Sequence, residues 1–82
     1  MATIESIEQS IAAGLDCQHL QVAGDGHHWD ALIVSSAFEG LSKVRQHQLV
    51  YATLGDRMRE EIHALSMTTL TPAQWAKLQE EG

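Results

Sequence analysis

Histidines are the residues of this chain whose side chains are best suited to chemistry. His27 and His28 are neighbours beside a glycine-containing turn, and His63 comes directly before the apolar segment 64–67. A neutral imidazole suits iron and other transition metals, and it changes charge near neutral pH. By residue type alone, however, a single histidine beside a strand is more often a structural or surface residue, and a histidine turn is typical of a solvated loop. The three histidines are therefore candidates for a metal site, and other observations must decide.

The remaining residues give little support to an enzyme. The chain has no phosphate-cradling glycine loop, no spacing that suggests a Ser-His-Asp arrangement, and no complete set of metal ligands. Its single cysteine, Cys17, is expected at the end of the first helix, away from the histidine turn, as an ordinary small residue. We therefore expect no catalytic activity.

Size and composition predict one domain over residues 1–82. With 82 residues, of which 44% are hydrophobic, the chain can form one small core but not two. Eleven acidic against five basic residues give a formal net charge of −6, which argues against nonspecific binding to phosphate backbones. The N-terminus lacks a signal-peptide pattern, no apolar run approaches the roughly 20 residues of a membrane span, and a single cysteine suits a reducing compartment. We expect a cytoplasmic protein.

The histidine turn is predicted to join two antiparallel strands. Polar and apolar residues alternate over 19–22, and the segment 29–34 is rich in strand formers. Between them lies Asp25-Gly26, a dipeptide preferred in tight hairpin turns because both central positions need positive φ. Asp25, His27 and His28 are therefore expected at the tip of a hairpin.

Helical patterns flank this hairpin on both sides. A first helix is predicted after the cap residue Thr3, a second over 41–54, and a short third one after Asp56. A third strand is predicted over 64–70, and Thr71-Pro72 is a strong start signal for a last helix. The predicted buried faces are Ile4, Ile7, Ile11 and Leu15 in the first helix, Leu41, Val44, His47, Tyr51 and Leu54 in the second, and Trp75 and Leu78 in the last. The order α-β-β-α-(α)-β-α with a leading hairpin indicates the α+β class.

Four segments, in this order and at this spacing, resemble the BolA-like family. They are Phe-Glu-Gly-Leu-Ser-Lys at 38–43, and the segments 45–51, 62–66 and 70–75. The resemblance covers nearly the whole chain, and the short turn over 24–29 looks more like the IbaG-like branch than like BolA itself. It implies a three-stranded mixed sheet with helices packed on one face, similar to the class II KH fold of certain RNA-binding domains.

The resemblance also implies a cofactor and a partner. Members of this family pair with monothiol glutaredoxins around a shared [2Fe-2S] cluster, and His63 matches the family's cluster-ligating histidine. A Cys or His on the hairpin loop supplies or supports a second contact in the family. This loop has no cysteine, so Asp25, His27 and His28 stay open for that role, with His27 as the first choice and His28 next.

Iron–sulfur clusters need about four ligands, so two histidines cannot hold one. The resemblance implies that a glutaredoxin thiolate and its bound glutathione supply the others. The implied protein is a monomer alone and a heterodimer with its partner, and it acts in iron–sulfur cluster maturation, trafficking or iron homeostasis.

A nucleic-acid-binding transcriptional regulator is the alternative, because the implied fold is KH-like and some members of the family are described as regulators. KH domains clamp the nucleic-acid backbone with a Gly-x-x-Gly loop, and no glycine pair in this chain has that spacing. The predicted helix 41–54 carries only two basic residues, Lys43 and Arg45. The sequence therefore favours the glutaredoxin partner over nucleic acid.

Overall fold

The computed structural model describes residues 2–60, 62 and 64–81, and its elements follow the predicted order. The element bounds are α1 Ile4–Gly14, β1 Cys17–Gly24, β2 Trp29–Ser35, α2 Lys43–Leu54, α3 Arg57–Glu60, β3 Leu65–Leu70 and α4 Pro72–Glu81. A short 3-10 helix, Ser36–Phe38, follows β2. Within the described part of the chain, no helix is long and apolar enough to cross a membrane.

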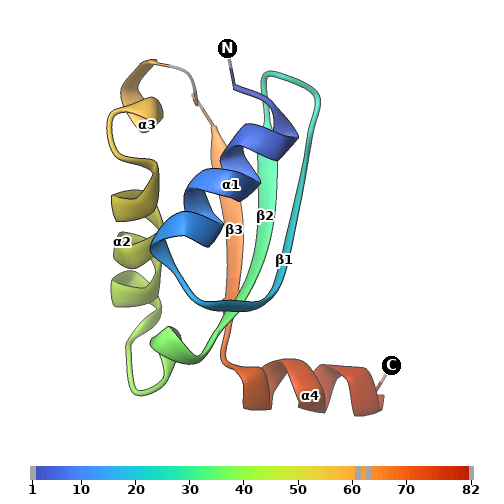
Figure 1. Ribbon diagram of the computed structural model, residues 1–82. Coiled ribbons are helices and arrows are strands. Elements are labelled where there is room, and N and C mark those ends of the chain that lie inside the picture. Colours follow the sequence, from blue (N-terminus) through green and yellow to red (C-terminus); the bar gives the residue numbers. More distant parts are fainter. Residues whose placement is uncertain (1, 61, 63, 82) are drawn as a thin grey trace.

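The sheet is mixed, and its order is β1-β2-β3. β1 pairs with β2 in antiparallel fashion, while β3 pairs with β2 in parallel. Trp29, the first residue of β2, lies opposite Gly24 of β1 and Leu65 of β3. The hairpin turn and the entry into β3 therefore share one end of the sheet, and α4 follows at the other end (Figure 1). The predicted α+β class, with its antiparallel hairpin, is confirmed.

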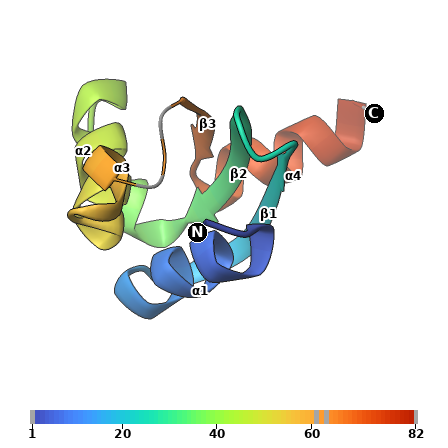
Figure 2. The same cartoon turned by 90° about the horizontal axis from the view of Figure 1, so that it is seen from above.

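α1 begins at its predicted cap and covers one face of the sheet. The Thr3 hydroxyl accepts the Ser6 N–H at 3.1 Å, and the Ser6 hydroxyl accepts the Thr3 N–H at 2.9 Å. Ile7 and Ile11 are fully buried, whereas Ile4 is 38% exposed at the start of the helix. The central residues of the predicted apolar face thus form the contact between α1 and the sheet, and α2 lies on the same side (Figure 2).

The inward face of α2 differs from the prediction. Val44 is 67% exposed and Tyr51 is 41% exposed, although the apolar pattern placed both in the core. The helix instead buries Gln46, Val50 and Leu54. Of the predicted face, Leu54 alone is fully inside, and the other four residues are half-buried or exposed.

Gln46 takes an inward position because its amide group joins three segments. Its Nε2 donates to the carbonyl oxygens of Phe38 at 3.2 Å and Leu41 at 3.0 Å. Its Oε1 accepts the hydroxyl of Thr69, on β3, at 2.7 Å. A buried amide is tolerated when its donors and its acceptor have partners. A search for apolar residues at helical spacing counts glutamine as a surface residue. The buried face predicted for α2 therefore excluded Gln46 and included Val44 and Tyr51 instead.

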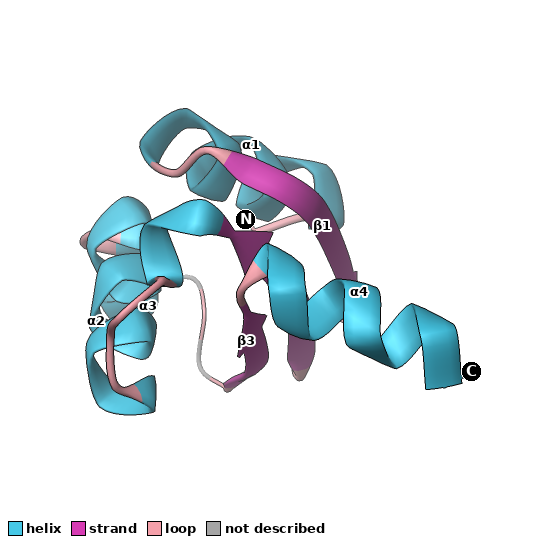
Figure 3. Ribbon diagram, turned by 90° about the horizontal axis from the view of Figure 1, so that it is seen from below, coloured by secondary structure: helices cyan, strands magenta, loops and turns pink. Residues whose placement is uncertain are grey.

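α4 lies across the sheet from α1 and α2 (Figure 3). Its predicted start is confirmed by two bonds: Thr71 Oγ1 accepts the Gln74 N–H at 3.2 Å, and Gln74 Oε1 accepts the Thr71 N–H at 2.9 Å. The Trp75 ring stacks on the His19 ring of β1, with centroids 4.6 Å apart and planes 16° apart. Trp75 is half-buried by this contact, but Leu78 is 48% exposed rather than buried. α1 and α2 thus share one face, as the resemblance implied, whereas α4 covers one end of the other face.

Candidate functional site at the hairpin rim

The hairpin turn comprises residues 25–28, and a single carboxylate organises it. Oδ1 of Asp25 accepts the backbone N–H groups of His27 at 2.8 Å and His28 at 2.9 Å. The backbone N–H of Asp25 donates to the carbonyl oxygen of His28 at 3.2 Å. Of the four turn residues, Gly26 alone has a positive φ, 97°. The prediction that Asp25, His27 and His28 form the tip of the hairpin is confirmed.

The turn is longer than its Asp-Gly dipeptide predicted. A two-residue hairpin reversal needs positive φ at both central residues. Here Asp25 contributes its side chain as the acceptor of an Asx-type turn, which spreads the reversal over four residues.

The base of the turn is joined to the chain that enters β3. The backbone N–H of Trp29 donates to the carbonyl oxygen of Ala64 at 2.9 Å, and Trp29 then pairs with Leu65 in the sheet. On its other side the indole ring lies over Gly24, where a Cβ atom would approach Cε3 of Trp29 to 2.4 Å. Trp29 thus links the turn to the start of β3, and the two lie side by side at the rim of the sheet (Figure 1).

His63, the predicted main ligand, lies outside the described residues. The structure does describe its neighbours: Ile62 is fully buried, and Ala64 is half-buried at the point where Trp29 bonds to it. A role for His63 beside the turn stays a prediction.

The turn side chains are open to solvent. His27, His28 and Asp25 are all exposed. The backbone N–H groups of His28 and His27 lower the pKa of the Asp25 carboxyl, and the two imidazoles add to this effect. Asp25 is therefore ionised in the neutral range, and both imidazoles are accessible to a metal ion or to a second protein.

The described residues do not form a complete metal site. No group of three His, Cys, Asp or Glu side chains among them is arranged to hold a metal ion. The turn offers the imidazoles of His27 and His28, together with a carboxylate whose Oδ1 already accepts two N–H groups. A cluster at this rim therefore needs donors from outside the described residues, from another molecule, or from both.

Cys17 is placed away from this rim. It begins β1 opposite Ser35, at the end of the sheet remote from the turn, rather than at the end of α1 as predicted. Burial, followed by the neighbouring Asp16 carboxylate, raises the pKa of the Cys17 thiol. Cys17 therefore lies at the wrong end of the sheet to contribute a ligand beside the turn of its own molecule, and its raised pKa disfavours the thiolate form that binds metals.

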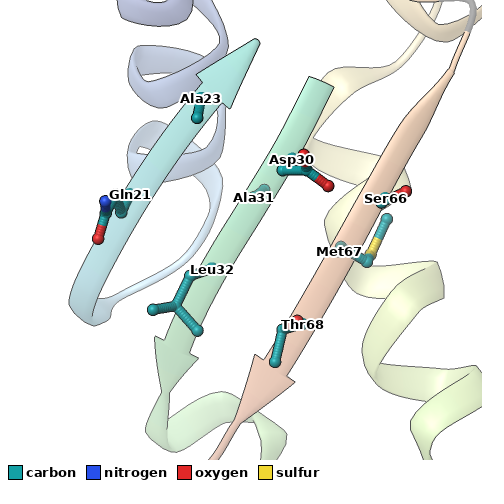
Figure 4. Close-up of a pocket in the computed structure, with 8 residues that line it drawn as sticks. All are labelled: Gln21, Ala23, Asp30, Ala31, Leu32, Ser66, Met67 and Thr68. Atoms are coloured by element: carbon teal, nitrogen blue, oxygen red, sulfur yellow. The ribbon is translucent and has the colours of Figure 1, made fainter. Parts of the chain in front are cut away.

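A shallow hollow of about 250 Å³ lies on the sheet face that α1 and α2 leave uncovered (Figure 4). Its lining residues come from all three strands and are Gln21, Ala23, Asp30, Ala31, Leu32, Ser66, Met67 and Thr68. Asp30 is the one charged group among them, and no histidine or cysteine lies beside it to complete a nucleophile and base. The hollow therefore offers surface and hydrogen-bonding groups rather than catalytic chemistry.

Sequence reasoning misses the roles of two residues that shape the rim. It places Asp25 in the turn and among the candidate ligands, but it does not predict that the carboxylate accepts the backbone N–H groups of the two histidines, although aspartate is a common first residue of such Asx turns. Trp29 was assigned only to a strand, although a preceding Gly24 indicates that something approaches the backbone closely there.

Comparisons with known proteins agree in both sequence and structure. A family model described as BolA-like protein matches residues 7–74. Over 72 residues the chain is 36% identical to the acid stress protein IbaG of Escherichia coli, covering 87% of this chain and 86% of that protein. It is 31% identical to the DNA-binding transcriptional regulator BolA of Haemophilus influenzae, covering 92% and 82%. A crystal structure described as a Bol-like protein from Babesia bovis matches with a TM-score of 0.87 and 30% identity, covering 96% and 95% of the two chains.

Proposed function

The chain belongs to the BolA-like protein family, and from that premise we propose that it is an accessory protein that binds a monothiol glutaredoxin and shares a bridging [2Fe-2S] cluster with it. His63 would be the main ligand from this chain, and His27 or His28 the auxiliary one. The protein would act in iron–sulfur cluster maturation, trafficking or iron homeostasis, without catalysis of its own.

One observation carries the proposal. The exposed imidazoles of the turn stand at the same end of the sheet as the chain that enters β3, and the Trp29–Ala64 hydrogen bond joins the two segments. His63 directly precedes Ala64 in the sequence, and the family resemblance assigns it the ligand role. Donors from a turn and from a strand entry would then converge on one rim, where a second protein can approach from solvent.

The chemistry of the donors supports a shared cluster over a resident one. A cluster needs about four protein or thiol ligands, and a cysteine thiolate is the usual one. The one cysteine of this chain lies at the far end of the sheet, and burial raises its pKa. A glutaredoxin thiolate and its bound glutathione would supply the missing sulfur ligands. An imidazole in place of a thiolate makes the cluster less negative and raises its reduction potential.

Reconstitution with a glutaredoxin tests the proposal. Mixing the protein with a monothiol glutaredoxin, ferrous iron, sulfide and glutathione should give a 1:1 complex whose visible absorption and circular dichroism differ from those of the glutaredoxin homodimer. His63→Ala should return the spectrum to that of the homodimer. His47→Ala is the matched control, because His47 lies half-buried on α2 and should leave the mixed spectrum unchanged. A spectrum that does not respond to His63→Ala would refute the ligand assignment.

Nucleic-acid binding is the second candidate function, and the similarity to a protein named as a DNA-binding regulator favours it. The charges weigh against it. Lys43 donates to the carbonyl oxygen of Thr69, and Arg57 is bonded to the Ser6 carbonyl at 2.9 Å and the Ser10 hydroxyl at 2.8 Å. Both cations thus bond to other segments of the same protein, whose formal net charge is −6. Both facts weaken the case for contacts with phosphate groups. A gel shift measured at rising salt decides, since phosphate contacts give a steep salt dependence of affinity.

A further inference from the structure

We propose that Asp25 positions the turn imidazoles and is not itself a ligand. This inference deepens the proposed function and rests on it. It assigns separate roles to three turn residues that all stay open as ligands in the sequence: the carboxylate of Asp25 fixes the backbone, and His27 or His28 presents the donor nitrogen.

The first step is the occupancy of the carboxylate. Asp25 Oδ1 accepts two backbone N–H groups, at 2.8 Å and 2.9 Å, and these N–H groups belong to the two candidate ligands themselves. A carboxylate oxygen that accepts two hydrogen bonds has both lone-pair directions in use. A metal at Oδ1 would have to displace the bonds that hold His27 and His28 in place, and among the described residues only the other carboxylate oxygen of Asp25, Oδ2, is left without a donor.

The second step is what those bonds do to the imidazoles. The carboxylate accepts the N–H groups of both His27 and His28, and this restrains the backbone at the two residues. The restrained backbone in turn sets the direction in which each Cβ atom, and with it each imidazole, leaves the chain. The bond from the Asp25 N–H to the His28 carbonyl oxygen, at 3.2 Å, closes the same loop from its other side. Gly26, with its positive φ of 97°, lets the chain reverse within this loop. An exposed turn of four residues is thereby given one shape before any ligand binds.

The third step connects that shape to the strand entry. Residue 28 is followed directly by Trp29, whose N–H donates to the Ala64 carbonyl oxygen at 2.9 Å and whose ring packs over Gly24. The turn is therefore fixed at its base relative to the chain that enters β3, and fixed at its tip by Asp25. Without Asp25 the base would persist, but the tip carrying the imidazoles would move freely.

The fourth step is ligand preference. Imidazole and thiolate suit iron in clusters, whereas a carboxylate is the ligand that magnesium and calcium prefer. Among the described residues, the imidazoles of His27 and His28 have no hydrogen-bond partner, so both ring nitrogens are free to bind. Donor chemistry thus points to the histidines, while the two bonds already made by Oδ1 of Asp25 point to a positioning role.

Two substitutions at one position separate the roles. Asp25→Asn keeps an oxygen acceptor in the same place and removes the charge and most of the metal affinity. Asp25→Ala removes the acceptor altogether. In the reconstituted complex with a monothiol glutaredoxin, a positioning role predicts that Asp25→Asn retains the mixed-cluster spectrum, while Asp25→Ala weakens it about tenfold in apparent affinity, the loss typical of a residue that orients a ligand. If Asp25→Asn fails as badly as Asp25→Ala, Asp25 is a ligand and the inference is overturned.

A second readout uses the protein without iron or partner. Amide hydrogen exchange at His27 and His28, measured by NMR, should accelerate about fivefold in Asp25→Ala and stay near the native rate in Asp25→Asn, since each bond is worth about 1 kcal/mol. Unchanged exchange in Asp25→Ala would overturn the inference, whatever the cluster does. Asp30→Ala is the matched control, because it removes an exposed carboxylate close to the turn without touching these N–H groups, and it should change neither readout.

The two readouts also separate failure of the inference from failure of the proposed function. If the native protein forms no mixed complex, the shared-cluster function is refuted, and the assignment of Asp25 as an aid to ligation falls with it. If the native complex forms and exchange responds to Asp25→Ala, but the cluster spectrum is the same in all variants, only the positioning role is overturned.

Discussion

At the scale of single residues, the imidazoles of the turn and the one thiol of the chain lie in different surroundings. The imidazoles of His27 and His28 are exposed on a turn whose backbone is held by Asp25. The Cys17 thiol is partly buried at the opposite end of the sheet, beside a carboxylate that further disfavours its charged form. Among the described residues the rim thus offers exposed nitrogen donors, and the shared cluster proposed above would obtain its sulfur ligands from another molecule.

We predict that Cys17 reacts slowly with alkylating reagents at neutral pH. Burial and the Asp16 carboxylate raise the pKa of the thiol, and only the thiolate attacks the reagent. In the folded protein, the rate of alkylation followed by mass spectrometry should rise with pH around a midpoint above that of free cysteine. The same protein unfolded in urea is the control and should show the ordinary midpoint. A folded-state midpoint at or below the unfolded one would contradict the prediction.

Among the elements, helices are attached to the sheet by polar contacts as well as by the apolar core. The carboxylate of Glu8, on α1, accepts the Val22 N–H of β1 at 3.3 Å. Lys43, at the start of α2, donates to the Thr69 carbonyl oxygen of β3. β1 and β3 are the two outer strands, so each edge carries a charged side chain at a backbone group. Such groups oppose the addition of a further strand at these edges.

The Gln46 contacts lead to a prediction about stability. Gln46→Ala should lower the free energy of unfolding by roughly 2–3 kcal/mol, because it leaves the buried Thr69 hydroxyl and the Phe38 and Leu41 carbonyl groups without their partner. Gln48→Ala, on the exposed side of the same helix, should change it by no more than about 0.5 kcal/mol. Urea titration monitored by circular dichroism measures both. Equal effects of the two substitutions would show that the amide network does not hold α2 in place.

Across the whole molecule, the parts that sequence predicts are those with local signals. The order of elements and the hairpin follow from the Thr3 cap, the Asp25-Gly26 turn and the Thr71-Pro72 start, each of which acts within a few residues. Which side chains of α2 and α4 are buried could not be predicted from local signals. It depends on Gln46 meeting Thr69 and on Trp75 meeting His19, pairs that are distant in sequence.

The candidate site, too, has one feature that the sequence predicts and one that it does not. Its location at one end of the sheet follows from a hairpin, because a turn carries its residues to the rim. The role of Asp25 does not follow, because a carboxylate in a turn can face its own backbone or a metal, and the residue type is the same in both cases. Only the 2.8 Å and 2.9 Å bonds to His27 and His28 distinguish the two.

The position of α4 provides a test that the rim and the C-terminal helix are independent parts of the molecule. α4 has no fully buried residue. It contacts the sheet through the Trp75 ring, which stacks on the ring of His19 in β1. Trp75→Ala should therefore lower the free energy of unfolding by about 1–2 kcal/mol, from lost apolar burial and lost stacking. Amide exchange within α4 should accelerate. Leu78→Ala, at a side chain that is 48% exposed on the same helix, should have an effect below about 0.5 kcal/mol.

The same substitution should leave the cluster unaffected. α4 follows β3 at the end of the sheet opposite the hairpin turn (Figure 1), so the bonds from Asp25 to the turn and from Trp29 to Ala64 do not depend on it. The mixed complex of Trp75→Ala with a glutaredoxin should show the native spectrum at a temperature where the protein is folded. If the spectrum is lost although circular dichroism shows an intact fold, then α4 belongs to the docking surface, and a partner would contact both ends of the sheet.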